Sequence, residues 1–243
     1  MREQDAPLRD RHDGGMIVSA HQPAFLPWLG YFDRIARSDV FVFLDGIQFE
    51  KNSFINRNRI KTKRGPLWLT IPVNHKGHTS STMVATTIAG DNSWRRKQLC
   101  SISQAYSRAP YFGSVFPKLE SLYKIEGATL ADTCFSQLQF WLSELSITTR
   151  IVRMSDLELS ERKSDLVLEI CQKLGATNYI SGALGRDYLE LAQFQAASVG
   201  VTFQDYAHPE YRQLHGDFVP NLSIVDAWMN LGPETAALFA PKA

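Results

Sequence analysis

The sequence lacks the features that mark membrane and secreted proteins. No segment approaches the roughly 18 consecutive apolar residues that a membrane-spanning helix needs, and the first residues, MREQDAPLRDRHDGG, lack the apolar centre of a signal peptide. We therefore expect a protein with no membrane span that is located in the cytoplasm. Cysteine is also scarce, because the 243 residues contain only three widely spaced cysteines and no CxxC pair. A disulfide framework and a CxxC zinc site are thereby excluded, and free buried thiols are expected.

Several motifs that hold phosphates or metal ions are missing as well. The chain contains neither GxGxxG nor GxxxxGK[ST], so a bound phosphate has to be held in some other way. No DxD-like motif is present, which disfavours a metal-dependent glycosyltransferase. His75 and His78 form an HxxH pair with no third ligand nearby in the sequence, so no metal site is expected.

The residues that are present predict an α/β fold. Short apolar runs rich in β-branched and aromatic residues alternate with segments in which apolar residues recur every three or four positions. This rhythm predicts an open, mainly parallel, Rossmann-like sheet with right-handed crossovers. The expected strands are 16–20, 39–45, 67–73, 148–153, 177–181 and 201–206, with 83–89 at an edge or in a hairpin.

The predicted organisation has four parts. Residues 1–15 read as a disordered leader, and residues 16–92 together with 147–232 form the α/β sheet domain. Residues 93–146 contain three helical stretches and form a helical insertion, and residues 233–243 form a tail.

Polar residues follow the predicted strands at the edge where ligands bind in open parallel sheets. His21 and Gln22 follow the first strand, and Asp45 and Gln48 follow the second. His21 is the candidate catalytic base, since imidazole exchanges protons near neutral pH, although it could instead satisfy loop carbonyls. Asp45 is a second catalytic or ligand-binding candidate, or else the start of an Asx turn. Gln22 and Gln48 are candidate substrate-binding residues.

The charge distribution indicates an anionic ligand. Residues 51–90 contain seven Lys and Arg residues and no Asp or Glu, so the rest of the chain carries 1 − 7 = −6. The segment NSFINRNRI is expected to be a helix, with Asn52, Asn56 and Arg59 on one face and Arg57 on another. Together with Lys51, these side chains would hold a phosphate, unless the cluster is an ordinary solvated face. Nucleic acid is disfavoured as a partner because stacking aromatics are not interleaved with the basic residues.

The final loop offers two more candidates. His208 and Tyr211 lie in AHPEYRQLHGDFVPN, a segment with aromatic residues and prolines. They either close over the substrate or simply pack against the body of the protein.

Long stretches of the chain resemble one protein family. HQPAFLPWLGYFDRI, FLDGIQFEKNSFINRNRIK, WLTIPV, YISGALGRDYL and YAHPEYRQLHGDFVPNLSIVDAWMNLG are similar to the WbqC-like protein family, from about Ile17 to Gly232. The resemblance implies a place in bacterial gene clusters for surface polysaccharide and other glycan assembly. The layout of LPWLGYF and FVFLDGIQFEKN is also similar to nucleotidylyltransferases, except that Trp28 and Tyr31 stand where the HxGH histidines would be.

Two classes of function remain open. The first is an enzyme that acts on a nucleotide-linked amino sugar or another phosphorylated metabolite, either by acyl or aminoacyl transfer or as a nucleotide-dependent ligase. ATP or a nucleotide sugar would then be a substrate, and the partner is a small anionic molecule. The second is a non-catalytic ligand-binding or scaffold protein of a glycan-assembly pathway.

Overall fold

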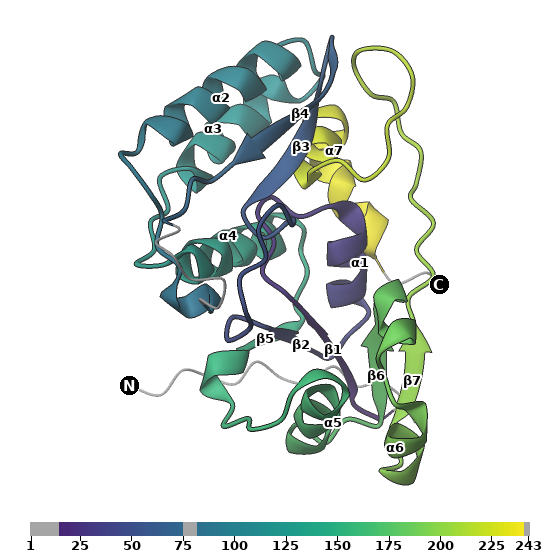
Figure 1. Cartoon of the computed structure of the whole chain (residues 1–243). Coiled ribbons are helices and arrows are strands. Elements are labelled where there is room, and N and C mark those ends of the chain that lie inside the picture. The colour runs from purple at the N-terminus through teal and green to yellow at the C-terminus, as the bar shows by residue number, and fades with distance from the viewer. Residues whose placement is uncertain (1–14, 75–81, 241–243) are drawn as a thin grey trace, which may run out of the picture.

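A computed structural model of the chain describes residues 15–74 and 82–240. Its centre is a five-stranded parallel sheet with the strand order β5-β2-β1-β6-β7 (Figure 1). The strands are β1 (Ile17–His21), β2 (Val40–Phe43), β5 (Arg150–Arg153), β6 (Asn178–Ser181) and β7 (Gly200–Phe203). This confirms the predicted α/β class. Numbered along the chain, the five parallel strands lie side by side in the order 3-2-1-4-5, which is the order of Rossmann folds.

Helices cover both faces of this sheet. On one face, α5 (Lys163–Lys173) and α6 (Leu191–Ala196) pack on Val18, Val40 and Val42. On the other face, α1 (Leu29–Ala36), α4 (Leu130–Glu144) and α7 (Ile224–Leu231) form part of a larger core that includes Phe41 and Phe43. Strands buried on both faces explain why β1 and β2 read as continuous apolar runs.

Two predicted elements of the segment 51–73 are wrong. NSFINRNRI is not a helix: Arg57–Thr62 form β3, which pairs antiparallel with β4 (Gly65–Thr70) in a separate two-stranded sheet. The expected strand 67–73 is therefore not part of the parallel sheet. The reason is the two-residue turn at Lys63 and Arg64, because a parallel connection needs a crossover of a dozen residues or more. Gly65 closes the turn with φ of +101°.

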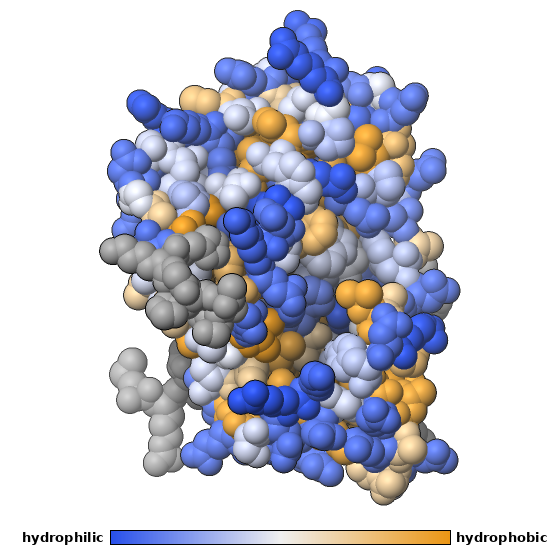
Figure 2. All heavy atoms as spheres, viewed as in Figure 1, coloured by the Kyte–Doolittle hydropathy of each residue, from blue (hydrophilic) through white to orange (hydrophobic). Residues whose placement is uncertain are grey.

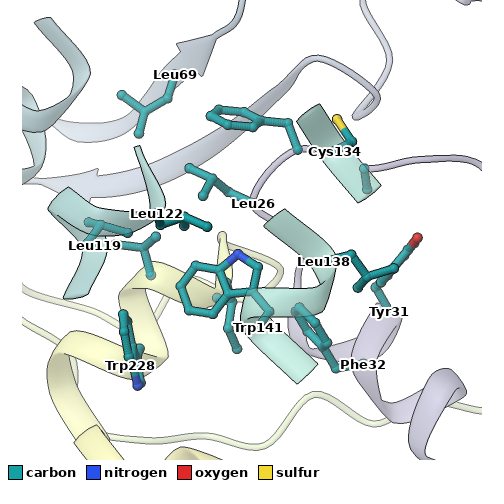
Figure 3. Packing of buried hydrophobic residues seen from close by; sticks show 14 of the residues in the cluster. Leu26, Tyr31, Phe32, Leu69, Leu119, Leu122, Cys134, Leu138, Trp141 and Trp228 are labelled. Atoms are coloured by element: carbon teal, nitrogen blue, oxygen red, sulfur yellow. The ribbon is translucent and has the colours of Figure 1, made fainter. Parts of the chain in front are cut away.

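The predicted helical insertion, residues 93–146, packs around the same hydrophobic core as one face of the sheet. It consists of α2 (Ser93–Tyr106), α3 (Phe112–Leu122) and α4. Figure 3 shows Trp141 of α4 among side chains from α1, α3, α7 and the loop after β1. The rings of Trp141 and Trp228 are 5.0 Å apart and nearly perpendicular. The sheet face and the helical segment are thus joined by one hydrophobic core.

Short 3₁₀ helices complete the description. They are η1 (Met83–Ala85), η2 (Met154–Asp156), η3 (Ala183–Asp187) and η4 (Gly232–Phe239). The segment 83–89, expected to be a strand, contributes η1 and a single bridge between Val73 and Ile88. Much of the expected tail forms η4, and Phe239 packs in the core. Most of the expected leader lies outside the described residues. No helix among the described residues is long and apolar enough to cross a membrane.

Candidate functional site

The order of the parallel strands reverses between β1 and β6. In open α/β sheets this reversal leaves a crevice at the carboxyl ends of the two strands, where ligands bind. Ser19 of β1 is paired with Ile180 of β6, and continuing this register by two residues sets His21 beside Gly182. The predicted base therefore lies at the one position of the sheet where topology favours a ligand.

His21 is partly buried and held in one orientation. Its Nδ1–H donates to the carbonyl of Gln22 at 2.8 Å, which leaves Nε2 of the neutral ring as a proton acceptor. The rings of Trp28 and Tyr31 meet the imidazole edge-on at 5.6 and 5.0 Å. Burial, together with the charge of Arg34, lowers the pKa of His21 to about 4. The ring is therefore neutral at pH 7.

Helix α1 brings a cation to the same place. Arg34 is only 8% exposed, and its Nε donates to Oε1 of Gln204 at 3.0 Å. Gln204 follows β7 and is itself fixed, because its Nε2 donates to Asp33 and to the carbonyl of Gly30. The guanidinium lies against Gly182, where a Cβ atom would be 2.6 Å from Nη2. Four segments of the chain thus meet at the end of β1 and β6.

Asp45 has a different environment from the one predicted. Its side chain is fully buried and accepts from Nε of Arg153 at 2.6 Å and from the backbone and hydroxyl of Ser155. Arg153 also binds Asp132 of α4 at 2.9 Å. Because both carboxylate oxygens already have donors, Asp45 joins β2, β5 and α4 in a buried polar network. A direct part in chemistry stays a prediction.

The two predicted glutamines lie on the loops after β1 and β2. Gln22 is partly buried, and its carbonyl accepts from His21 and, at 3.4 Å, from the hydroxyl of Tyr31. Gln48 is exposed and forms an isolated antiparallel bridge with Thr82. His75 and His78 lie outside the described residues. Within the described residues, no three His, Cys, Asp or Glu side chains are grouped so that they could hold a metal ion.

The basic residues of β3 lie differently from the predicted helical stripe. Because side chains of a strand alternate, Arg57 and Arg59 share one face and Asn56 and Asn58 the other. The guanidinium carbons of Arg57 and Arg59 lie 4.2 and 5.5 Å from the ring centre of Trp68 on β4. Arg57 is tied by its terminal nitrogens to Asn52. We call Arg57, Arg59 and Trp68 the hairpin cluster.

The other members of the predicted phosphate site are divided between surface and core. Lys51 is exposed next to Asn52, whose backbone adopts φ of +66°. Asn56 is buried and donates to the carbonyl of Ile71 at 2.8 Å, so it fixes the hairpin to the following segment. Of the three basic residues in this predicted site, Arg57 binds Asn52. The charged groups of Lys51 and Arg59 have no hydrogen-bond partner among the described residues. The role of all these residues in binding stays a prediction.

A row of aromatic rings joins His21 to the hairpin cluster. Trp28 lies 5.6 Å from His21, Phe54 lies 5.3 Å from Trp28, and Trp68 lies 5.8 Å from Phe54, between ring centres. Phe54 and Trp68 are 38% and 41% exposed. On the face that Figure 2 shows, apolar residues lie in small groups between polar ones. The exposed rings of the row, with the arginines beside them, form a surface on which a flat polar ring could stack.

The final loop is attached to β3 and α7 by buried polar groups. Tyr211 donates to Asp226 at 2.8 Å, and Tyr106 donates to the other oxygen of the same carboxylate at 2.7 Å. Lys61, which is 2% exposed, donates to Gln213 and to two carbonyls of the loop. The ring of His208 stacks on Tyr211, and its Nε2 is buried without a partner. Whether the loop acts as a lid stays a prediction.

Sequence reasoning missed three members of this region. Arg34 has no distinguishing neighbour in the sequence, because a single Arg in an amphipathic helix reads as a solvent-facing residue. Trp68 lies in a continuous apolar run, so its face could not be assigned. Gln204 lies inside the predicted strand 201–206, whereas β7 ends at Phe203, so its place after a strand end was not recognised.

Comparisons with known proteins identify the family. The profile of the WbqC-like protein family matches residues 22–237. The chain belongs to the WbqC-like protein family. The uncharacterized protein Rv1507c of Mycobacterium tuberculosis (strain ATCC 25618 / H37Rv) is 36% identical over 219 residues, which cover 89% of this chain and 94% of that protein. No solved structure matches the chain. The resemblance found in the sequence motifs is therefore confirmed at the level of the family.

Proposed function

We propose that this WbqC-like protein is an enzyme of glycan biosynthesis that acts on a nucleotide-linked amino sugar or a related phosphorylated metabolite. In this reaction the amine attacks the acyl carbon of an activated acyl or aminoacyl donor, the bond between that carbon and its leaving group breaks, and His21 takes the proton that the amine loses. The observation that carries the proposal is the row of rings from His21 through Trp28 and Phe54 to Trp68, which ends beside Arg57 and Arg59. An extended ligand with a flat base, phosphates and a sugar suits this row.

Each part of such a ligand has a chemical counterpart. A nucleobase or sugar stacks on exposed aromatic rings, and Arg59 supplies a charged fork for phosphate oxygens. The buried Nε of Arg59 has no hydrogen-bond partner in the described residues, which leaves its donor capacity unused. Lys51 is exposed nearby in the sequence and would add a point charge. Gln22, Gln48, His208 and Tyr211 would line the remainder of the site.

The chemical step needs a base because an ammonium group cannot attack an acyl carbon. Nε2 of His21 is unprotonated at pH 7, and Nδ1 donates to the carbonyl of Gln22, so Nε2 is the nitrogen that can take a proton from the attacking amine. General-base catalysis contributes about 10²–10⁴-fold to a rate, most of all when the pKa of the base lies near the working pH. A protein that binds the nucleotide but shows no transfer would fit the ligand-binding alternative instead.

The proposal is tested by titrating the protein with ATP, UDP-sugars and dTDP-amino sugars. We expect one of them to raise the melting temperature, because a ligand that binds only the native state stabilises it by mass action. In that case Arg59→Ala and Trp68→Ala should each weaken binding by about 1–3 kcal/mol. Arg64→Ala, which removes an exposed charge from the turn of the same hairpin, is the matched control and should have no effect.

Two results would contradict the proposal. One is the absence of any change in melting temperature with all of these nucleotides. The other is a loss of affinity in Arg64→Ala as large as in Arg59→Ala, which would mean that binding depends only on the general charge of the segment. Calorimetry on the same variants measures the affinities directly.

A further inference from the structure

Arg34 has no direct ion-pair partner in the part of the chain that the structure describes, although the carboxylate of Asp33 acts on its charge from farther away. Arg34 makes none of the ion pairs found there, although it is 8% exposed. The nearest carboxylate in sequence, Asp33, is engaged by Gln204 and Arg37. A buried cation without a partner is costly for a protein, and it is tolerated where a ligand supplies the opposite charge.

The two terminal nitrogens of Arg34 are free to bind. Only Nε has a hydrogen-bond acceptor among residues 15–74 and 82–240, namely Gln204. Nη1 and Nη2 have no hydrogen-bond acceptor among these residues, and 8% of the surface of Arg34 remains accessible. Their two parallel N–H groups match the two oxygens of a carboxylate or a phosphate.

The surroundings of this guanidinium hold it in place for a ligand. Gln204 fixes Nε from one side, and Gly182 makes room for the planar head because a Cβ atom there would lie 2.6 Å from Nη2. Tyr31, Tyr179 and Tyr188 are close enough to influence its pKa, and their hydroxyls are neutral at pH 7. The charge is therefore oriented, and the one carboxylate that acts on it is that of Asp33, which binds Gln204 and Arg37.

From this arrangement we infer that Arg34, at the carboxyl ends of β1 and β6, binds an oxyanion of the substrate, a carboxylate or a phosphate, next to Nε2 of His21. The inference deepens the proposed function and rests on it only in treating this edge of the sheet as the site. It names a second anionic group, apart from the phosphates assigned to the hairpin cluster. The anion would also bring a negative charge near His21 and so oppose the effect by which Arg34 disfavours the protonated ring.

The test is a titration of protein labelled with ¹⁵N in its histidine rings. Sodium acetate and sodium phosphate are added separately, with sodium chloride used to keep the ionic strength constant, and His21→Gln assigns the His21 signals. We expect saturable shifts of the His21 ring nitrogens with at least one anion, together with a rise in the pKa of His21. A response to acetate alone identifies a carboxylate site, and a response to phosphate alone identifies a phosphate site.

Variants show whether the anion binds at Arg34. Arg34→Gln should lower the affinity for the anion at least tenfold. Arg34→Lys keeps the charge but loses the planar fork, and it should lower the affinity less. Arg37→Gln removes a more exposed charge from the residue after the same helix and should bind the anion as wild type does. The melting temperature of Arg34→Gln should be equal to or higher than that of wild type, because the cost of burying the charge is removed.

Two outcomes would overturn the inference: no saturable change with either anion, or equal binding by wild type and Arg34→Gln. Neither would affect nucleotide binding through Arg59 and Trp68. Conversely, anion binding at Arg34 in a protein that binds no nucleotide would overturn the proposed function and leave this inference standing.

Discussion

At the scale of single residues, position was easier to predict than environment. The place of His21 at a strand end follows from the apolar run before it, and the structure confirms that strand. Its neighbours were not predictable, because Trp28 and Tyr31 reach the ring only through the path of the loop and α1. The buried charge of Arg34 lies 13 positions away in the chain and helps to lower the pKa of His21.

The lowered pKa of His21 predicts a pH-dependent stability. The pKa is about 4 in the folded protein and about 6.5 in the unfolded chain, so the unfolded chain binds the proton first as the pH falls. The contribution is fully present above pH 6.5 and is lost between about pH 6.5 and 4, by up to about 1.4 kcal/mol per pH unit. His21→Gln cannot take up the proton and should flatten this decrease, as measured by urea unfolding at pH 7, 6 and 5.

His208 provides the internal comparison for this experiment. Burial lowers the pKa of His208 as well, so His21→Gln should retain the part of the pH dependence that His208 causes. The decrease should therefore become smaller without disappearing. An unchanged pH dependence in His21→Gln would mean that the imidazole of His21 is as free to protonate in the folded protein as in the unfolded chain.

At the scale of elements, the parallel strands and most helices were predictable, and the hairpin was not. The buried strand β2 is a continuous apolar run, whereas β3 begins with alternating Arg and Asn side chains that resemble a polar helix face. Tertiary contacts hold it as a strand. Asn58 donates to the carbonyl of Leu26, and the N–H of Lys61 donates to the hydroxyl of Tyr106. These partners lie 32 and 45 residues away, beyond the reach of local patterns.

The link between β3, α2 and α7 should stabilise the fold. Tyr106 accepts from the N–H of Lys61 and donates to Asp226, so Tyr106→Phe leaves a buried donor and a buried carboxylate oxygen without their partner. We expect a loss of about 1–3 kcal/mol in the free energy of unfolding. Urea unfolding measures this loss.

Tyr188→Phe is the matched control, because Tyr188 is 45% exposed. It should change the free energy of unfolding by less than about 0.5 kcal/mol. Equal effects of the two substitutions would show that the buried network contributes nothing to stability.

At the scale of the whole molecule, the order of the strands creates the candidate site. The alternation of strands and helices predicted a parallel sheet, but not which strands are neighbours, because buried apolar strands look alike in sequence. The reversal between β1 and β6 brings together residues that are more than 150 positions apart, such as His21 and Gly182. Helix α1 then places Tyr31 and Arg34, β6 places Tyr179, and the end of β7 places Gln204. The site therefore depends on the complete fold.

Substituting Gly182 by alanine tests the contact between Arg34 and the end of β6, because it adds one methyl group at that contact. Its backbone has φ of −73°, which alanine adopts without strain, and the first atom that a Cβ would meet is the flexible end of Arg34. Gly182→Ala should therefore move the guanidinium out of its place with little effect on the melting temperature, while weakening anion binding at least tenfold in the histidine-detected titration. Gly113→Ala in α3 is the control, because a Cβ there meets nothing within 4 Å, and it should bind the anion as wild type does. If Gly182→Ala also bound the anion normally, the position of the Arg34 head against Gly182 would not matter for binding, and the oxyanion would have to be held by other groups at this edge of the sheet.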